Sequence, residues 1–230
     1  MIKSGIDQDA LVDMFSQATT KQGAALRKAV SETTLKALQG RELTLSNIRG
    51  VLKSVTEAST RGAAQNTLPA PDLEELLRQV FDGMDAALLK TVQANQLALT
   101  QFASQGAGLQ DKQFKGALNN LEKLEDLFFD TVNKATQGAS LPLGQPWDQV
   151  LGAMRAKGTS SGGQATQTVQ KLTEQARDTL RESRAGSSKA LQAMLDGYSA
   201  MVSGVLIGMA EGLQSGGVTE GSSKPRARRT

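Results

Sequence analysis

Apolar side chains recur every three or four residues along most of this chain, which is the spacing of one face of an α-helix. The clearest series lies between residues 77 and 102. Its members are Leu77, Phe81, Met84, Leu88, Val92, Asn95, Leu99 and Phe102. The pattern predicts a long amphipathic helix with a narrow apolar face, as in helical bundles and coiled coils.

A second helical series follows a glycine-rich turn at 106–108. Its apolar members are Phe114, Leu118, Leu121, Leu124, Leu127, Phe128, Phe129 and Val132. Asp72 and Glu75 have the spacing of a capping box, which predicts that the first helix of the pair begins at residue 72. Because the connection is short, we expect 72–104 and 110–137 to form an antiparallel hairpin.

Capping residues predict further helices on both sides of this hairpin. Asp7 starts a first helix that runs to about Gln39, and Thr44 starts a second. Pro146 occupies the first position of a short helix, and a long last helix follows a flexible polar break at 158–163.

Glycines, prolines and caps thus divide the chain into four regions. We expect an N-terminal helical region at 1–66, the central hairpin at 72–138, a C-terminal helical region at 146–215 and a disordered basic tail at 216–230. Aromatic residues make up only 3% of the chain, so strand-forming side chains are scarce. The expected fold class is all-α: an elongated helical bundle with coiled-coil-like hairpins and a flexible tail.

Eight large apolar residues of the central helices form the main candidate interaction surface, which we call the hydrophobic seam. The seam consists of Leu77, Phe81, Met84, Leu88, Leu99, Phe102, Leu121 and Phe128. We expect it either to form the core or to exchange the core for an external apolar surface. Between residues 165 and 190 the only large apolar residues are Val169, Leu172 and Leu180. Such a lean helix buries little area, so we expect homo-oligomerisation or a surface partner to supply the missing burial.

A stripe of glycines at every fourth position marks the C-terminal region. The stripe consists of Gly204, Gly208, Gly212 and Gly216. Glycine inside a helix costs about 1 kcal/mol relative to alanine, so a repeated stripe indicates close helix–helix approach. Three interpretations remain open: a tight crossing within the chain, self-association, or insertion at a lipid or polymer surface.

The residue types present narrow the chemistry. The chain has no histidine and no cysteine, which excludes imidazole and thiolate metal ligands, disulfides and the usual serine–histidine and thiol nucleophiles. Residues 158–162 match Gly-x-Ser-x-Gly, but a nucleophile elbow needs a preceding strand and a histidine, so we interpret them as a polar turn. We therefore expect no enzymatic activity, no catalytic or metal-binding residues and no cofactor. Tyr198, the only tyrosine, is the first residue to substitute if turnover is found.

One predicted helix carries several carboxylates. Its acidic residues include Glu122, Glu125, Asp126 and Asp130. Carboxylates alone can hold a hard cation, but lysines are interspersed here, so a solvated helix face is the favoured interpretation.

The positive charge is confined to the end of the chain. The net charge is +3, and because residues 1–217 contain 22 basic and 22 acidic side chains, the whole excess lies in 218–230. The basic residues of this tail are Lys224, Arg226, Arg228 and Arg229. Four charges neutralise only a few phosphates, so any contact with nucleic acid is expected to be weak and salt-dependent.

We expect no transmembrane span in the C-terminal third of the chain. The longest uncharged stretch of the C-terminal third, Gly197–Ala210, has 14 residues, whereas about 20 are needed to cross a bilayer. The first residues are acidic and lack the apolar core of an export signal. We expect a cytoplasmic protein, soluble or peripherally attached to a surface.

Residues 91–102, with the sequence TVQANQLALTQF, alternate asparagine and glutamine with alanine and leucine. This segment resembles the amphipathic helices of bacterial phasins, alanine- and glutamine-rich proteins that coat intracellular polyhydroxyalkanoate granules, and the resemblance covers about 70–135. Two further segments, 38–44 and 121–129, resemble an uncharacterised bacterial all-helical family, a likeness that carries no activity with it.

The phasin resemblance implies a non-enzymatic structural protein that presents amphipathic helices to a hydrophobic granule, to a lipid surface or to itself. The alternative is a self-assembling helical scaffold whose basic tail tethers nucleic acid or another acidic partner.

Overall fold

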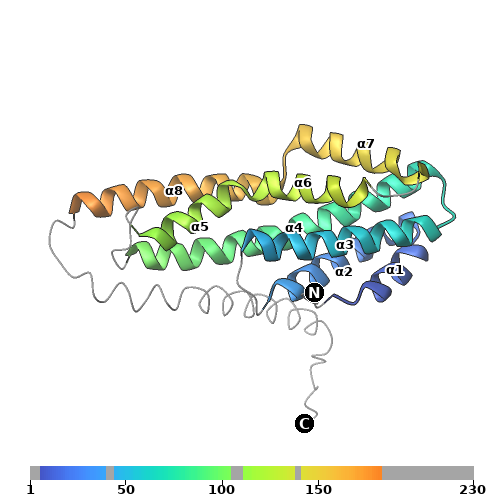
Figure 1. Ribbon diagram of the computed structural model, residues 1–230, viewed down its shortest axis with the longest axis horizontal. Coiled ribbons are helices and arrows are strands. Elements are labelled where there is room, and N and C mark those ends of the chain that lie inside the picture. Colours follow the sequence, from blue (N-terminus) through green and yellow to red (C-terminus); the bar gives the residue numbers. More distant parts are fainter. Residues whose placement is uncertain (1–5, 40–43, 105–110, 138–140, 183–230) are drawn as a thin grey trace, which may run out of the picture.

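The computed structural model describes residues 6–39, 44–104, 111–137 and 141–182, and these form a long, narrow body built from helices (Figure 1). The α-helices are α1 (Gln8–Ser16), α2 (Gly23–Leu38), α3 (Leu45–Gln65), α4 (Ala70–Ser104), α5 (Lys112–Glu122), α6 (Leu124–Thr136), α7 (Leu141–Lys157) and α8 (Ser160–Glu182). A short 3₁₀ turn, Thr20–Gln22, precedes α2, and no strand occurs in these ranges. The predicted all-α fold is confirmed.

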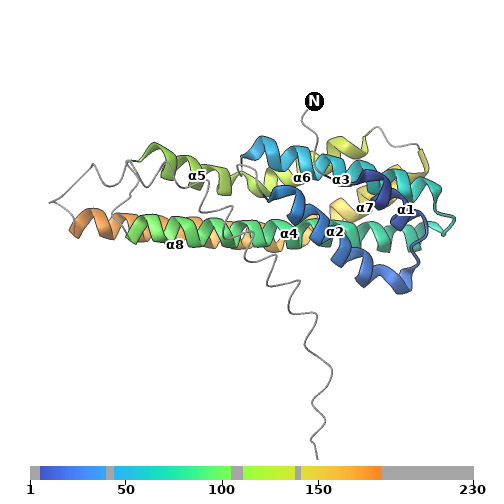
Figure 2. The ribbon, with the colours of Figure 1, turned by 90° about the horizontal axis from the view of Figure 1, so that it is seen from below.

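Helix α4 is the axis of the bundle. It packs most extensively on α2 and α8 and also contacts α7, while α1 packs on α3, α3 packs on α6, and α5 packs on α8. The chain does return antiparallel to α4 through α5 and α6 (Figures 1 and 2). The main packing partners of α4 are nevertheless α2 and α8, which the sequence did not predict.

The predicted first helix is interrupted between Ser16 and Gly23. Asp7 caps α1 as expected, since its Oδ1 accepts the backbone N–H of Ala10 at 3.0 Å. The chain then turns at a capping box, in which Gln22 Oε1 accepts the backbone N–H of Thr19 at 3.0 Å. A local polar contact therefore overrides the helical spacing of the apolar residues.

The boundaries of α3 are set by polar side chains. Thr44 caps its start as predicted, because Thr44 Oγ1 accepts the backbone N–H of Asn47 at 3.2 Å. Just beyond its end, Asn66 Nδ2 donates to the carbonyl oxygens of Phe15 and Ala18 at 2.9 and 3.0 Å. One amide thus satisfies carbonyls at the end of α1 and fixes α1 against α3.

Three other predicted boundaries shift. Helix α4 begins at Ala70 rather than residue 72, because the carbonyl of Pro69 accepts the backbone N–H groups of Asp72 and Leu73. The long helix predicted after it is divided at Lys123 into α5 and α6. Helix α7 begins at Leu141, so Pro146 lies inside it rather than at its first position.

The core is continuous along the bundle and centres on α4. Phe81 of α4 stacks on Phe128 of α6, with ring centroids 4.4 Å apart, and Phe129 lies 5.6 Å from Phe81. Trp147 of α7 is fully buried and donates its indole N–H to Thr60 Oγ1 of α3 at 3.1 Å. The only tryptophan is thereby satisfied inside the core and fixes α7 on α3.

Two glycines allow helices to approach unusually closely. A Cβ on Gly83 of α4 would lie 2.7 Å from the carbonyl oxygen of Arg27 in α2 and 3.0 Å from Val30 Cβ. A Cβ on Gly62 of α3 would lie 2.7 Å from Phe15 Cβ in α1. These helix pairs can pack as observed only because both positions lack a side chain.

We expect Gly83→Ala to lower the free energy of unfolding by about 1–3 kcal/mol, because the added methyl forces α2 away from α4. Gly50→Ala is the matched control, since a Cβ at Gly50 of α3 has nothing within 4 Å. That variant should gain about 0.5–1 kcal/mol from helix propensity alone. Urea unfolding followed by circular dichroism measures both; equal gains for the two variants would contradict the close contact at Gly83.

Candidate functional site

The hydrophobic seam lies inside the bundle. All eight of its residues are buried, and the most exposed of them, Leu121, retains 6% of its accessible surface. The seam therefore forms part of the core of the bundle, which is one of the two roles predicted for it. Exchange for an external surface stays a prediction.

The other two sequence-predicted sites lie outside the described residues. These are the glycine stripe Gly204, Gly208, Gly212 and Gly216, and the basic residues Lys224, Arg226, Arg228 and Arg229. Their proposed roles in helix packing and in binding an acidic partner stay predictions.

A cluster of buried polar groups, which the sequence did not predict, surrounds the N-terminus of α8. Asp85 of α4 is 8% exposed and accepts two backbone N–H groups. Its Oδ2 and Oδ1 lie 2.9 Å from the nitrogens of Ser160 and Ser161, respectively. Both carboxylate oxygens of Asp85 therefore face the first turn of α8.

Glu125 of α6 completes this cap from the other side. Its Oε1 accepts the backbone N–H and the hydroxyl of Thr159, at 2.8 and 2.7 Å. Thr159 Oγ1 in turn accepts the backbone N–H of Gly162 at 2.9 Å. The free N–H groups at the start of α8 are thus satisfied by two carboxylates and one hydroxyl, which the helix dipole also favours. We call Asp85, Glu125 and Thr159 the α8 latch.

Gly162 is required for this arrangement. A Cβ at this position would overlap the carboxyl carbon of Glu125 and lie 2.6 Å from both of its oxygens. The adjacent Gly163 has nothing within 4 Å of the corresponding position. The latch therefore requires glycine at position 162 but not at position 163.

The latch corrects two sequence-based interpretations. The break expected at 158–163 is confined to Gly158, whose φ is +76°, and to Thr159, because α8 already begins at Ser160. Glu125 does not belong to a solvated acidic face, since its carboxylate binds Thr159. The Gly-x-Ser-x-Gly match follows α7 and opens α8, so it lies between two helices rather than after a strand.

Part of this cluster has a signal in the sequence. Thr159 precedes two serines at a helix start, which is a preferred N-cap residue in a preferred position. Asp85 directly follows the core residue Met84, so it lies beside the seam rather than on the polar face. Their contact could not be predicted because Asp85 and Ser160 are 75 residues apart in the sequence.

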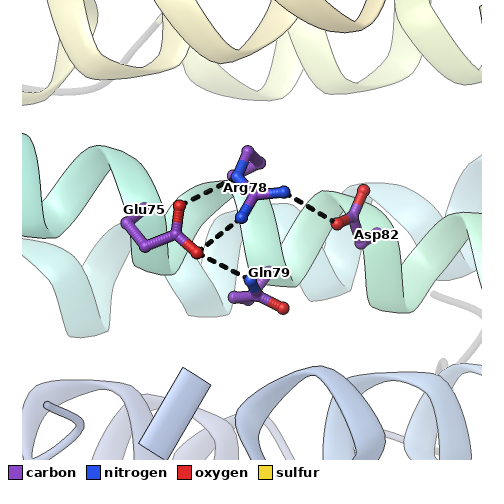
Figure 3. A network of polar contacts seen from close by, with 4 residues as sticks. All are labelled: Glu75, Arg78, Gln79 and Asp82. Carbon is purple, nitrogen blue, oxygen red and sulfur yellow. Dashed lines mark hydrogen bonds and ion pairs between the residues drawn. The ribbon is translucent and has the colours of Figure 1, made fainter. Parts of the chain in front are cut away.

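A second polar network follows the outer face of α4 (Figure 3). Arg78 Nη2 and Nε donate to the two carboxylate oxygens of Glu75 at 2.6 and 2.9 Å, and Nη1 lies 3.4 Å from Asp82 Oδ2. Gln79 Nε2 donates to Glu75 at 2.7 Å, while Gln79 Cγ lies 3.1 Å from the position that a Cβ on Gly23 would take. Gln79 therefore links this network to the start of α2.

The network shifts the ionisation of its members. Hydrogen bonds from Arg78 lower the pKa of Glu75 below its ordinary value of 4.5, against the opposing effect of desolvation. The same hydrogen bonds raise the pKa of Arg78. Both side chains are 41% exposed, so their contribution to stability is small.

A small surface pocket of about 240 Å³ opens between α3 and α6. It is lined by Arg49, Lys53, Asp130, Thr131, Lys134 and Ala135. Lys134 lies 3.1 Å from Asp130, and Lys53 lies 3.7 Å from Glu57. Much of the positive charge of this pocket is therefore compensated.

The described helices also bear on membrane and metal binding. None of the described helices combines the length and the apolar character needed to cross a bilayer. Within the described ranges, no group of three or more acidic side chains is placed to hold a metal ion.

We expect the stabilisation from Glu75 to depend on pH. Because its pKa is lower in the folded chain than in the unfolded chain, the contribution is present above about pH 4.5 and is lost as the pH falls through the lowered value. Glu75→Gln should slightly lower the urea midpoint at neutral pH, and the difference should be smaller at an acidic pH below 4.5. Arg78→Gln should show the same dependence; a difference that is equal at both pH values would refute the pairing.

The chain was also compared with known proteins. No curated protein and no solved structure matched it at a significant level. A family model described as "Family of unknown function (DUF6781)" matches residues 1–215. Because this match covers most of the sequence, the chain belongs to the DUF6781 family.

Proposed function

We propose that this protein is a non-enzymatic, phasin-like interaction protein that binds a hydrophobic granule or lipid surface through amphipathic helices. The observation that supports this most directly is the division of α4 into two faces. Over its 35 residues, α4 carries an apolar stripe that is buried, beside polar positions such as Glu75 and Arg78 whose side chains are 41% exposed. A helix of this kind can cover an oily surface as readily as it covers a protein core.

The closed bundle itself offers little apolar surface. Among the described residues, the exposed large hydrophobic side chains are Met14 of α1 and Leu97 of α4. Binding to an apolar surface therefore has to come from parting of the helices or from the uncharged segment 197–210.

The competing function is a scaffold that self-assembles and holds nucleic acid or another acidic partner. It is favoured by one observation, the confinement of the whole net charge of +3 to the last 13 residues. A basic segment attached to a neutral body would act as an electrostatic tether.

Removal of residues 218–230 separates the two functions. The full-length chain and the truncated chain are mixed with neutral polyhydroxyalkanoate particles, with phosphatidylcholine vesicles and with double-stranded DNA, and the bound fraction is measured by sedimentation. We expect both chains to bind particles or vesicles equally, because apolar burial does not involve the tail. Any retention on DNA should be lost with the tail and weaken steeply with salt.

Two results would overturn the proposal. Failure of the full-length chain to bind either particles or vesicles at micromolar concentration would remove the surface-binding function. Tight DNA binding that disappears on truncation, without particle binding, would establish the scaffold instead.

A further inference from the structure

Helix α8 is attached to the bundle by few large side chains. Its buried positions include Ala165, Thr168, Leu172 and Ala176, of which only Leu172 is large and apolar. The hydroxyl of Thr168 is buried without a hydrogen-bond partner, which weakens the contact further. Val169 is partly buried against the core, so among its described side chains α8 contributes fewer large apolar residues to the core than α4 does.

Strong polar contacts hold α8 at its first turn. Asp85 and Glu125 bind there with four hydrogen bonds of 2.7 to 2.9 Å, all to charged acceptors. Hydrogen bonds to ionised acceptors are about twice as strong as neutral ones. Further along, Gln164 Nε2 donates to Gln96 Oε1 of α4 at 2.9 Å, a neutral contact between partly buried side chains. The latch is thus a charge-assisted attachment of α8 to both α4 and α6.

Large apolar side chains lie beneath this helix. At the end of the bundle remote from α1 and α7, the described body narrows to α4, α5 and α8 (Figures 1 and 2). The main packing partner of α5 is α8, and α4 also packs on α8. Leu99, Phe102, Phe114 and Leu118 are buried in this part of α4 and α5. Removal of α8 would expose this half of the core while α2 and α3 stay packed on the rest of α4.

We propose that α8 is a detachable strap, held by the latch of Asp85 and Glu125, whose release uncovers the α4–α5 apolar surface for binding to a neutral hydrophobic particle. The identity of the bound particle rests on the proposed function, whereas the release of α8 rests only on the contacts described above. Release of α8 uncovers the Asp85 and Glu125 carboxylates near α5, whose Lys112 and Lys115 side chains are exposed. Because these charges balance, the uncovered surface has no preference for a charged membrane, and its apolar side chains favour a neutral particle.

Two adjacent glycines provide a matched test of the strap. Gly162→Ala places a methyl against the Glu125 carboxylate, whereas Gly163→Ala adds the same methyl where nothing lies within 4 Å. We expect amide hydrogen exchange in α8 of the full-length chain to accelerate about tenfold or more in Gly162→Ala, as local opening becomes easier. Exchange in α3 should not change, and Gly163→Ala should leave both rates unchanged or slower.

Asp85→Asn tests the latch from α4. It preserves the shape of the side chain and removes the charge that two backbone N–H groups share. It should accelerate exchange in α8 in the same way. Asp130→Asn, which removes an exposed ion pair from α6, is the control and should have no effect. Equal acceleration of α8 and α3 in every variant would overturn the strap, because α8 would then open only with the whole bundle.

The route to the surface is tested with a disulfide between α2 and α4. Gly23→Cys with Gln79→Cys joins positions that lie close enough for a bridge, since Gln79 Cγ is 3.1 Å from the Cβ position of Gly23. The chain has no other cysteine, so the oxidised and reduced forms of one protein serve as a matched pair. We expect both forms to bind neutral polyhydroxyalkanoate particles equally, and Gly162→Ala to bind them several-fold faster than Gly163→Ala.

The possible failures are distinguishable. Loss of particle binding on oxidation would show that the bundle opens between α2 and α4, which overturns the strap as the route but retains the surface function. Accelerated exchange in α8 without particle binding by any form would retain the motion and overturn the hydrophobic partner.

Discussion

The apolar stripe of α4 can be removed from water only if other helices cover it on several sides, and this requirement organises the whole bundle. A helix of 35 residues is about 50 Å long, longer than any of its described neighbours. Several short helices must therefore cover it in turn. Helices α2, α3, α6 and α7 cover the first part of α4, and α8 with α5 covers the last part. The aromatic contact between Phe81 and Phe128 marks the point where the return of the chain through α6 closes over α4.

The helical character of the chain could be predicted from its sequence because periodicity and caps act locally. Asp7 and Thr44 cap their helices as expected, and the seam spacing in α4 corresponds to one buried face. The partners of α4 could not be predicted in the same way. The repeating apolar face of α4 shows that other helices must pack on it. It does not show that these helices are α2 and α8, because other helices of the chain have apolar residues at the same spacing.

The polar cluster at α8 was hidden for a related reason. Gly162 belongs to a segment rich in glycine and serine, which favours turns when only neighbouring residues are considered. Two carboxylates from α4 and α6 reverse that preference, because they satisfy the N–H groups that a helix start leaves free. The glycines at 62 and 83 likewise cost helix propensity locally, and their compensation is visible only in the helix on the other side of the contact.

The distribution of interactions along α8 determines how the bundle can open. Apolar burial is spread over many positions, so helices such as α2 and α3 can leave α4 only in a step that exposes much of the core at once. In α8 strong polar contacts lie at the first turn and few of the described buried side chains are large and apolar, so the strap that we propose opens while the rest of the core stays closed. Under the proposed surface-binding function this difference matters, because opening of the whole core in water would favour aggregation.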